Sequence, residues 1–210
     1  MLRSLKPQTL KWIAFLAASA PLMWLILDTF GIAGGSLGAN PVEALLHRAG
    51  WWGLMLLLVT LAVTPVRELT GMAALIQIRR LVGLYAFFYV VLHVLVYTIL
   101  DQRMALGPIL EDIVERPYIT VGLAAFVLLI PLAVTSTNAS RRRLKARWNQ
   151  LHKLVYPIGV LGVWHYWWQV KQDITVPLIL AAILCALLGY RYANWLKRRR
   201  RRAARAQHAS

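Results

Sequence analysis

Acidic residues and cysteine are both scarce in this chain of 210 residues. Only 8 Asp and Glu stand against 24 Lys and Arg, which gives a formal net charge of +16. The single cysteine, Cys185, lies in an apolar run, so neither a disulfide framework nor a CxxC metal site is available. Polar residues are also few, because 59% of the chain is hydrophobic and the mean hydropathy is +0.57. This composition excludes an ordinary soluble domain and predicts an integral membrane protein.

The basic residues interrupt long apolar runs instead of covering one face of a soluble fold. Nucleic-acid binding, the usual alternative for so basic a chain, is therefore not expected. Six of the apolar runs are close to the twenty or so residues that cross a bilayer. They lie at about residues 10–30, 47–66, 81–100, 119–137, 152–170 and 176–196. We therefore predict an all-α membrane protein, built as a six-transmembrane helix bundle.

The connections between these runs differ in composition. Residues 31–46 are polar and rich in helix-breaking residues, and residues 67–80 are amphiphilic enough to rest on the membrane surface. Residues 101–118 form an expected loop with four acidic residues. A basic loop at residues 141–147 and a short turn at residues 171–175 complete the set.

The distribution of charge predicts the orientation of the bundle, because Lys and Arg accumulate in loops that stay in the cytoplasm. The two ends and alternate connections hold 20 of the 24 basic residues, and seven of the eight acidic residues lie toward the other side. Both termini are therefore expected in the cytoplasm. Residues 1–9 would form the N-terminus, 10–196 the membrane domain and 197–210 a basic tail that contacts anionic lipid.

Two histidines lie inside predicted spans, where an ionisable side chain is costly and marks a functional site. His93 follows Leu81 by twelve residues, and His165 follows His152 by thirteen. At about 1.5 Å per residue both lie about 18–20 Å from the cytoplasmic side. Two neutral imidazoles that face each other at one depth are what bis-histidine coordination of a haem iron requires. We therefore predict that His93 and His165 are ligands of haem iron.

His152 is expected near the cytoplasmic edge, about 20 Å from His165, which leaves room for a second cofactor. On an ideal helix the two side chains point about 140° apart, although Pro157 between them can kink or rewind the helix. No histidine of the third span reaches this depth, where the sequence has Arg79 and Arg80. His152 is therefore a candidate ligand with an unusual partner, or a residue that binds lipid or a haem propionate.

Three segments resemble the MsrQ/YedZ family, within the ferric-reductase-like transmembrane superfamily. They are HRAGWWGL at residues 47–54 with Thr64-Pro65, RRLVGLYAFFY at residues 79–89 before His93, and WNQLHKLVY at residues 148–156 before His165. The combination of RRxxGLY, a mid-span histidine and LHxLVY before a further histidine is the most specific part. The resemblance extends over about residues 8–196.

This resemblance implies a haem-binding membrane subunit of the bacterial inner membrane that carries b-type haem and FMN. Such subunits pass electrons from a cytoplasmic flavin reductase or quinone to a periplasmic molybdopterin-containing reductase, which repairs methionine sulfoxide in oxidised proteins. By position, His93, His152 and His165 fall on the family's haem-binding histidines, and Arg79 on a basic position near the cytoplasmic-side site. The chain would be an electron-transfer subunit without catalytic residues of its own.

Two features depart from the wider superfamily. Its members usually have two histidines on each of two helices, whereas here only the fifth span has two. The chain also has no soluble FAD or NADPH domain, so an outside electron donor is expected. Alternatives are a stand-alone quinol-oxidising cytochrome b or metal reductase, a small proton-coupled transporter and a structural anchor. Almost no acidic residues lie in the spans, which disfavours the transporter.

Overall fold

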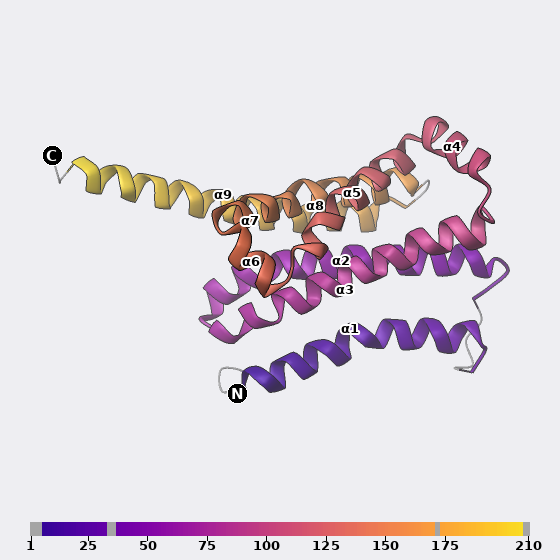
Figure 1. The fold of residues 1–210 in the computed structure, drawn as a ribbon, viewed down its shortest axis with the longest axis horizontal. Coiled ribbons are helices and arrows are strands. Elements are labelled where there is room, and N and C mark those ends of the chain that lie inside the picture. Colours follow the sequence, from indigo (N-terminus) through magenta and orange to yellow (C-terminus); the bar gives the residue numbers. More distant parts are fainter. Residues whose placement is uncertain (1–5, 33–36, 171–172, 208–210) are drawn as a thin grey trace.

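The computed structural model describes residues 6–32, 37–170 and 173–207 (Figure 1). Every regular element in these ranges is helical, and no strand occurs among them. Within the described ranges, five helices are long and apolar enough to cross a membrane. They are α1 (Pro7–Thr29), α2 (Pro41–Thr70), α3 (Arg79–Leu95) with its continuation η3 (Val96–Asp101), α5 (Pro117–Val134) and α9 (Thr175–Gln207). The predicted all-α membrane fold is confirmed to this extent.

The expected fifth span corresponds to α8 (Val155–Gln169), which has 15 residues and is shorter than the other five. A six-span bundle therefore stays a prediction. Shorter helices join the long ones, namely η2 (Ala73–Gln77), α4 (Leu106–Glu115), α6 (Asn138–Leu144), α7 (Ala146–Leu151) and η4 (His152–Leu154). Large apolar side chains on α1 face outward, with Leu16 and Trp24 exposed by 63% and 66%. Such outward apolar surface suits contact with lipid.

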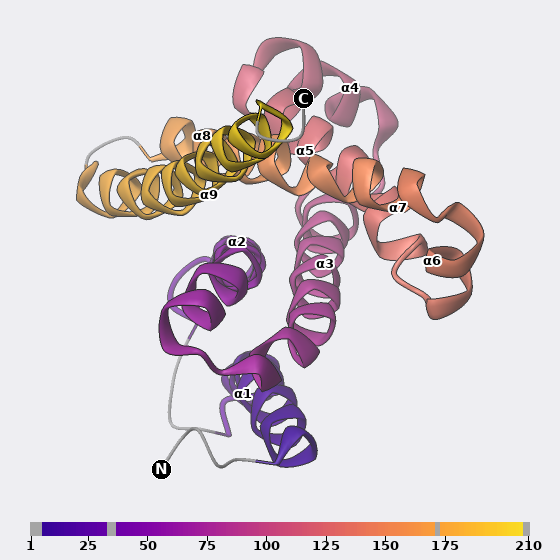
Figure 2. The same ribbon diagram turned by 90° about the vertical axis from the view of Figure 1, so that its left-hand side faces the viewer.

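The long helices form two neighbouring groups (Figures 1 and 2). Helices α2 and α3 run antiparallel and pack closely, α1 packs against both of them, and α5 packs against α8, which also contacts α9. Leu61, Ala86 and Tyr89, which are completely buried, form the centre of the core. The two termini lie at one end of the bundle and α4 at the opposite end (Figure 1).

Helix α2 does not end at about residue 66, where the second predicted span ends, but continues through Pro65 to Thr70. Proline has no N–H, so the carbonyl of Leu61, four residues earlier, lacks its helical donor. The Nη2 atom of Arg191 on α9 donates to this carbonyl at 2.6 Å. A side chain from another helix thus replaces the missing backbone hydrogen bond.

Two predicted loops contain helices. Residues 101–118 include α4, so the prediction of a loop there is wrong over Leu106–Glu115. Its exposed apolar residues recur every fourth position, at Leu106, Leu110 and Val114, while Asp112 is buried on another face. The predicted basic loop at residues 141–147 likewise coincides with the end of α6 and the start of α7.

The segment from His152 to Val170 is not one continuous α-helix. The 3-10 turn η4 separates α7 from α8, and Pro157 lies in the first turn of α8. Proline is tolerated at this position because an N–H in the first turn has no helical acceptor. The angle of about 140° for an ideal helix therefore does not apply to His152 and His165. Residues 1–5, 33–36, 171–172 and 208–210, which belong to the predicted N-terminus, polar connection, turn and tail, lie outside the described residues.

Candidate functional site

His93 of α3 and His165 of α8 lie next to each other in the interior of the bundle. Their ring centroids are 6.1 Å apart and the ring planes are inclined by 80°. The two histidines come from different antiparallel helix pairs, α2 with α3 and α5 with α8. Counting residues from the ends of the spans thus correctly predicts that these two side chains meet.

Each of the two imidazoles is oriented by a backbone carbonyl. His93 Nδ1 lies 2.9 Å from the oxygen of Leu46, and His165 Nδ1 lies 2.7 Å from the oxygen of Tyr118. A carbonyl only accepts, so both Nδ1 atoms carry the proton and donate it. The Nε2 atom of each ring then has a free lone pair, and neither makes a hydrogen bond to any described residue. This is the tautomer that a metal-binding histidine needs.

The separation of the two rings fits one metal ion between them. An imidazole nitrogen lies about 2.0–2.1 Å from a bound first-row metal and about 1.2 Å from the centre of its own ring. Two imidazoles on opposite sides of one ion therefore have centroids about 6.4–6.6 Å apart, a few tenths of an ångström more than the observed 6.1 Å. The spacing of the two rings is thus compatible with one metal ion held between them.

A glycine on the neighbouring helix makes room for each ring. A Cβ atom on Gly50 of α2 would lie 2.9 Å from His93 Nδ1, and one on Gly122 of α5 would lie 2.7 Å from His165 Nδ1. Both glycines precede their histidine by 43 residues and follow the residue with the accepting carbonyl by four. The two helix pairs therefore build the same support twice. Sequence patterns alone did not point to these glycines, although the repeated spacing is visible in the chain.

The chemistry of the donors favours haem over a bare metal ion. No group of three or more His, Cys, Asp or Glu that could hold a metal occurs in the part of the chain that the structure describes. A haem iron takes four ligands from its porphyrin and needs only axial ligands from the protein. Two facing imidazoles in an apolar interior can therefore hold haem, whereas two protein ligands alone would not close a structural metal site.

His152 lies apart from this pair. Its ring stacks on Trp148 with centroids 3.8 Å apart, and its Nδ1 lies 3.1 Å from the carbonyl oxygen of Trp148. Its Nε2 is buried without a hydrogen-bond partner among the described residues. Arg79 is close enough for its charge to act on this imidazole, whereas Arg80 is exposed and donates to Asn138 at 3.3 Å. Of the two predicted arginines, only Arg79 lies with His152.

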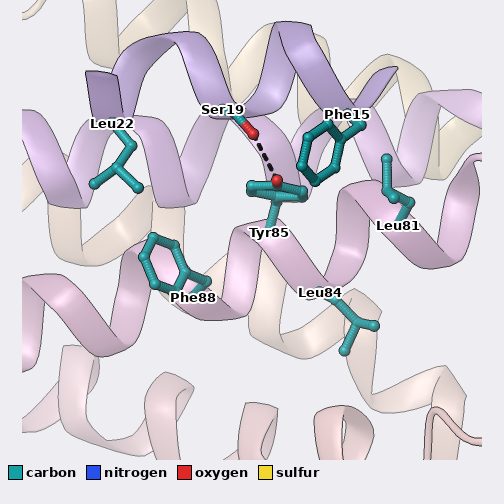
Figure 3. Close-up of a pocket in the computed structure, with 7 residues that line it drawn as sticks. All are labelled: Phe15, Ser19, Leu22, Leu81, Leu84, Tyr85 and Phe88. Atoms are coloured by element: carbon teal, nitrogen blue, oxygen red, sulfur yellow. Dashed lines mark hydrogen bonds between the residues drawn. The ribbon is translucent and has the colours of Figure 1, made fainter. Parts of the chain in front are cut away.

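A pocket of about 420 Å³ lies between α1 and α3, and no histidine lines it. Its walls are apolar except for the hydroxyls of Ser19 and Tyr85, which point toward each other and are 2.6 Å apart (Figure 3). Phe15 and Phe88 contribute aromatic surface on either side of Tyr85. The pocket is thus apolar except for this one pair of hydroxyl groups, and it is separate from both histidine sites.

Comparison with known proteins identifies the family. Residues 49–163, more than half of the chain, match the family described as "Ferric reductase like transmembrane component". The "Protein-methionine-sulfoxide reductase heme-binding subunit MsrQ" of Xanthomonas oryzae pv. oryzae is 50% identical over 199 residues, which cover 95% of this chain and 91% of the relative.

Two further relatives carry the same name. The protein of Xanthomonas campestris pv. campestris is 52% identical over 187 residues, covering 89% of this chain and 86% of the relative. That of Rhodospirillum rubrum is 52% identical over 189 residues, covering 89% of this chain and 88% of the relative. No solved structure matches the chain. The sequence comparisons agree with the resemblance seen in the motifs, and the chain belongs to the MsrQ family of ferric-reductase-like membrane proteins.

Proposed function

We propose that this chain is the haem-binding membrane subunit of a protein-methionine-sulfoxide reductase system. It carries electrons from a cytoplasmic flavin reductase or from quinol, across the bacterial inner membrane, to a periplasmic molybdenum-containing reductase. The observation that carries this proposal is the His93–His165 pair, with ring centroids 6.1 Å apart and both Nε2 atoms free. The names of the relatives support the same cofactor and system.

In this proposal His93 and His165 would hold a b-type haem through their free Nε2 atoms. When bound, the haem supplies the one-electron chemistry, and the protein fixes its orientation and surrounds it with apolar side chains. The two backbone carbonyls keep the imidazoles neutral at Nε2 and hold their planes. No residue of this chain has to transform a substrate.

The site at His152 and Arg79 is the proposed point of electron entry. The unpaired Nε2 of His152 is available to a second cofactor, and the adjacent Arg79 suits an acidic group of that cofactor. FMN belongs to the proposal through the resemblance to the family, since its phosphate would suit the same arginine. A second haem with His152 as one ligand is the alternative occupant.

The pocket between α1 and α3 supports quinol as one electron donor. A quinol ring needs apolar walls and a hydrogen-bonding group, and the Ser19–Tyr85 hydroxyl pair supplies the latter. If quinol binds there, Tyr85→Phe should lower the rate of haem reduction by added quinol. The same variant should leave reduction by a flavin reductase unchanged, because that donor would enter at His152.

The proposed orientation places both termini in the cytoplasm and α4 on the periplasmic side. The position of the termini at one end of the bundle supports this orientation (Figure 1), as does the distribution of basic residues. At about 1.5 Å per residue α8 is about 22 Å long, against a hydrocarbon core of about 30 Å. The adjoining turn η4 extends this segment toward the full thickness, which favours six spans.

The proposed partner docks at the end of the bundle that carries residues 101–118. The exposed apolar stripe of α4, made of Leu106, Leu110 and Val114, offers a surface for it. Beside the stripe, Asp112 forms an ion pair with Arg116 at 3.1 Å and accepts hydrogen bonds from Tyr97 and Gln102. These contacts hold α4 against the outer end of α3.

The test reconstitutes the purified chain in sealed vesicles. A molybdenum-containing methionine sulfoxide reductase is enclosed, and a flavin reductase with NADH is added outside. We expect NADH oxidation coupled to reduction of methionine sulfoxide in a protein substrate, and we expect the coupling to be lost in His93→Ala. Equal sulfoxide reduction with and without the chain would contradict the proposed function.

A further inference from the structure

Three helices meet at the side chain of Arg191, namely α2, α8 and its own helix α9. Its Nη2 donates to the carbonyl of Leu61 on α2 at 2.6 Å, and its Nη1 donates to the hydroxyl of Tyr156 on α8 at 3.2 Å. The guanidinium carbon lies 5.3 Å from the centre of the Tyr156 ring. Arg79, the first residue of α3, is close enough for its charge to act on Arg191. Arg191 is thereby held in one place, with part of its donor capacity unused.

Three buried polar atoms at this end of the bundle have no hydrogen-bond partner among the described residues. They are Thr64 Oγ1, His152 Nε2 and Arg191 Nε. Thr64 lies three residues after Leu61 on α2, and Arg79 is close enough for its charge to act on both His152 and Arg191. Unpaired buried polar atoms are rare in native proteins. A single ligand at this end of the bundle would account for all three, whereas each would otherwise need its own explanation.

Thr64 differs from its neighbours on the same helix. The hydroxyls of Thr60 and Thr70 each donate to the carbonyl four residues earlier, as threonine commonly does inside a helix. The hydroxyl of Thr64 makes no such bond within the described part of the chain. It therefore remains free to donate to a bound group.

The charges of this region are not balanced by protein carboxylates. Glu68 is the acidic residue nearest in sequence to Thr64, and it is occupied by Tyr190, Asn194 and Arg198. Neither Arg79 nor Arg191 forms an ion pair with any described acidic residue. Two guanidinium groups that interact in a partly buried place repel each other unless an anion joins them.

We propose that Arg191 and Thr64 form an anion subsite, which receives an acidic group of the cofactor that His152 faces. The group is a carboxylate or a phosphate, both of which the arginine fork and a hydroxyl recognise. Arg191 and Thr64 are positioning residues that fix the cofactor at this end of the bundle. The inference deepens the proposed function and rests on it, because it requires a cofactor near His152.

Thr64→Val gives the first test, since valine has nearly the shape of threonine and removes only the hydroxyl. Removal of an unpaired buried hydroxyl should raise the unfolding temperature of the cofactor-free protein. The same variant should weaken cofactor binding at this end at least threefold. Greater stability with unchanged cofactor affinity would overturn the role of Thr64.

Arg191→Gln, combined with altered cofactors, gives the second test. In nanodiscs of zwitterionic lipid, the affinity of the cofactor-free protein is measured for haem and haem dimethyl ester, and for FMN and riboflavin. For the cofactor that occupies the site, the analogue without the acidic group, haem dimethyl ester or riboflavin, should bind the wild type at least tenfold more weakly than haem or FMN. For Arg191→Gln, the affinities of the cofactor and of this analogue should differ less than twofold. Arg80→Gln is the matched control, because Arg80 is exposed and donates to Asn138, and it should behave as the wild type.

The outcomes separate the inference from the proposed function. If the effect that depends on Arg191 appears with haem and its dimethyl ester, the acidic group is a haem carboxylate. If it appears with FMN and riboflavin, the group is the flavin phosphate. Equal sensitivity of wild type and Arg191→Gln in both pairs would overturn the inference, even where haem still binds at His93 and His165. A change in Arg191→Gln that appears only when anionic lipid is added would assign the site to lipid and would also overturn it. Absence of any haem absorption in the wild type would instead overturn the proposed function.

Discussion

Replacing Gly122 by alanine places a methyl group where the imidazole of His165 lies. The added Cβ would be 2.7 Å from Nδ1 and 2.8 Å from Cε1, whereas ordinary van der Waals contact begins at 3.4 Å. The ring has to move away from α5, and this movement stretches the 2.7 Å hydrogen bond to the Tyr118 carbonyl. Overpacking of this kind costs about 1–3 kcal/mol. If the whole cost falls on the ligand-bound state, haem affinity decreases by about 5- to 150-fold.

The assay is a haem titration of the purified Gly122→Ala protein, followed by its Soret absorption. Gly50→Ala should have a smaller effect in the same direction, because its Cβ would lie 2.9 Å and 3.1 Å from the same two atoms of His93. Gly189→Ala on α9 is the control, since no atom of the described residues lies within 4 Å of its Cβ. An unchanged affinity in Gly122→Ala would refute the view that this glycine positions the ligand.

Three further predictions concern other parts of the bundle. Arg191→Leu should lower the unfolding temperature less in a Pro65→Ala background than in the wild type. The introduced alanine supplies the N–H that the Leu61 carbonyl lacks, and thermal unfolding in detergent measures the effect in both backgrounds. Trp148→Leu removes the ring that stacks on His152 and should lower occupancy of the cofactor near His152, without changing the absorption of the haem at His93 and His165. Leu110→Ser on α4 should weaken binding of the periplasmic reductase severalfold and leave the haem content unchanged. The affinity of the reductase for nanodiscs that contain the chain measures this effect.

The apolar runs, and the number of residues from the end of a span to each histidine, predict the main features of the fold and of the site at His93 and His165. The fold and the site at His93 and His165 depend on local properties, namely the length of a span and the rise of a helix. These properties do not change when the helices pack together. His93 and His165 therefore meet as expected, although 72 residues separate them. The interruption before α8 was less predictable. Pro157 indicates an irregularity, but it does not tell whether the helix kinks or a 3-10 turn precedes it.

Contacts between distant helices were beyond the reach of these patterns. Arg191 resembles the other basic residues that follow the last apolar run, and only packing brings it to Leu61, 130 residues away. Pro65 was the available clue, because a proline inside a membrane helix leaves a carbonyl that needs another donor. Helix α4 was also missed, since Gly107 and Pro108 near its start are typical of a loop. Its apolar residues at every fourth position were the competing indication.

The haem-to-protein ratio of the purified chain and its histidine variants is the decisive measurement for haem ligation by His93 and His165. Reduced-minus-oxidised spectra of the wild type should show a low-spin b-type haem. We predict that His93→Ala and His165→Ala each lose this absorption, while His152→Ala retains the part that belongs to the haem held by His93 and His165. A wild-type protein without a Soret band, or a band that persists unchanged in both His93→Ala and His165→Ala, would contradict this ligation.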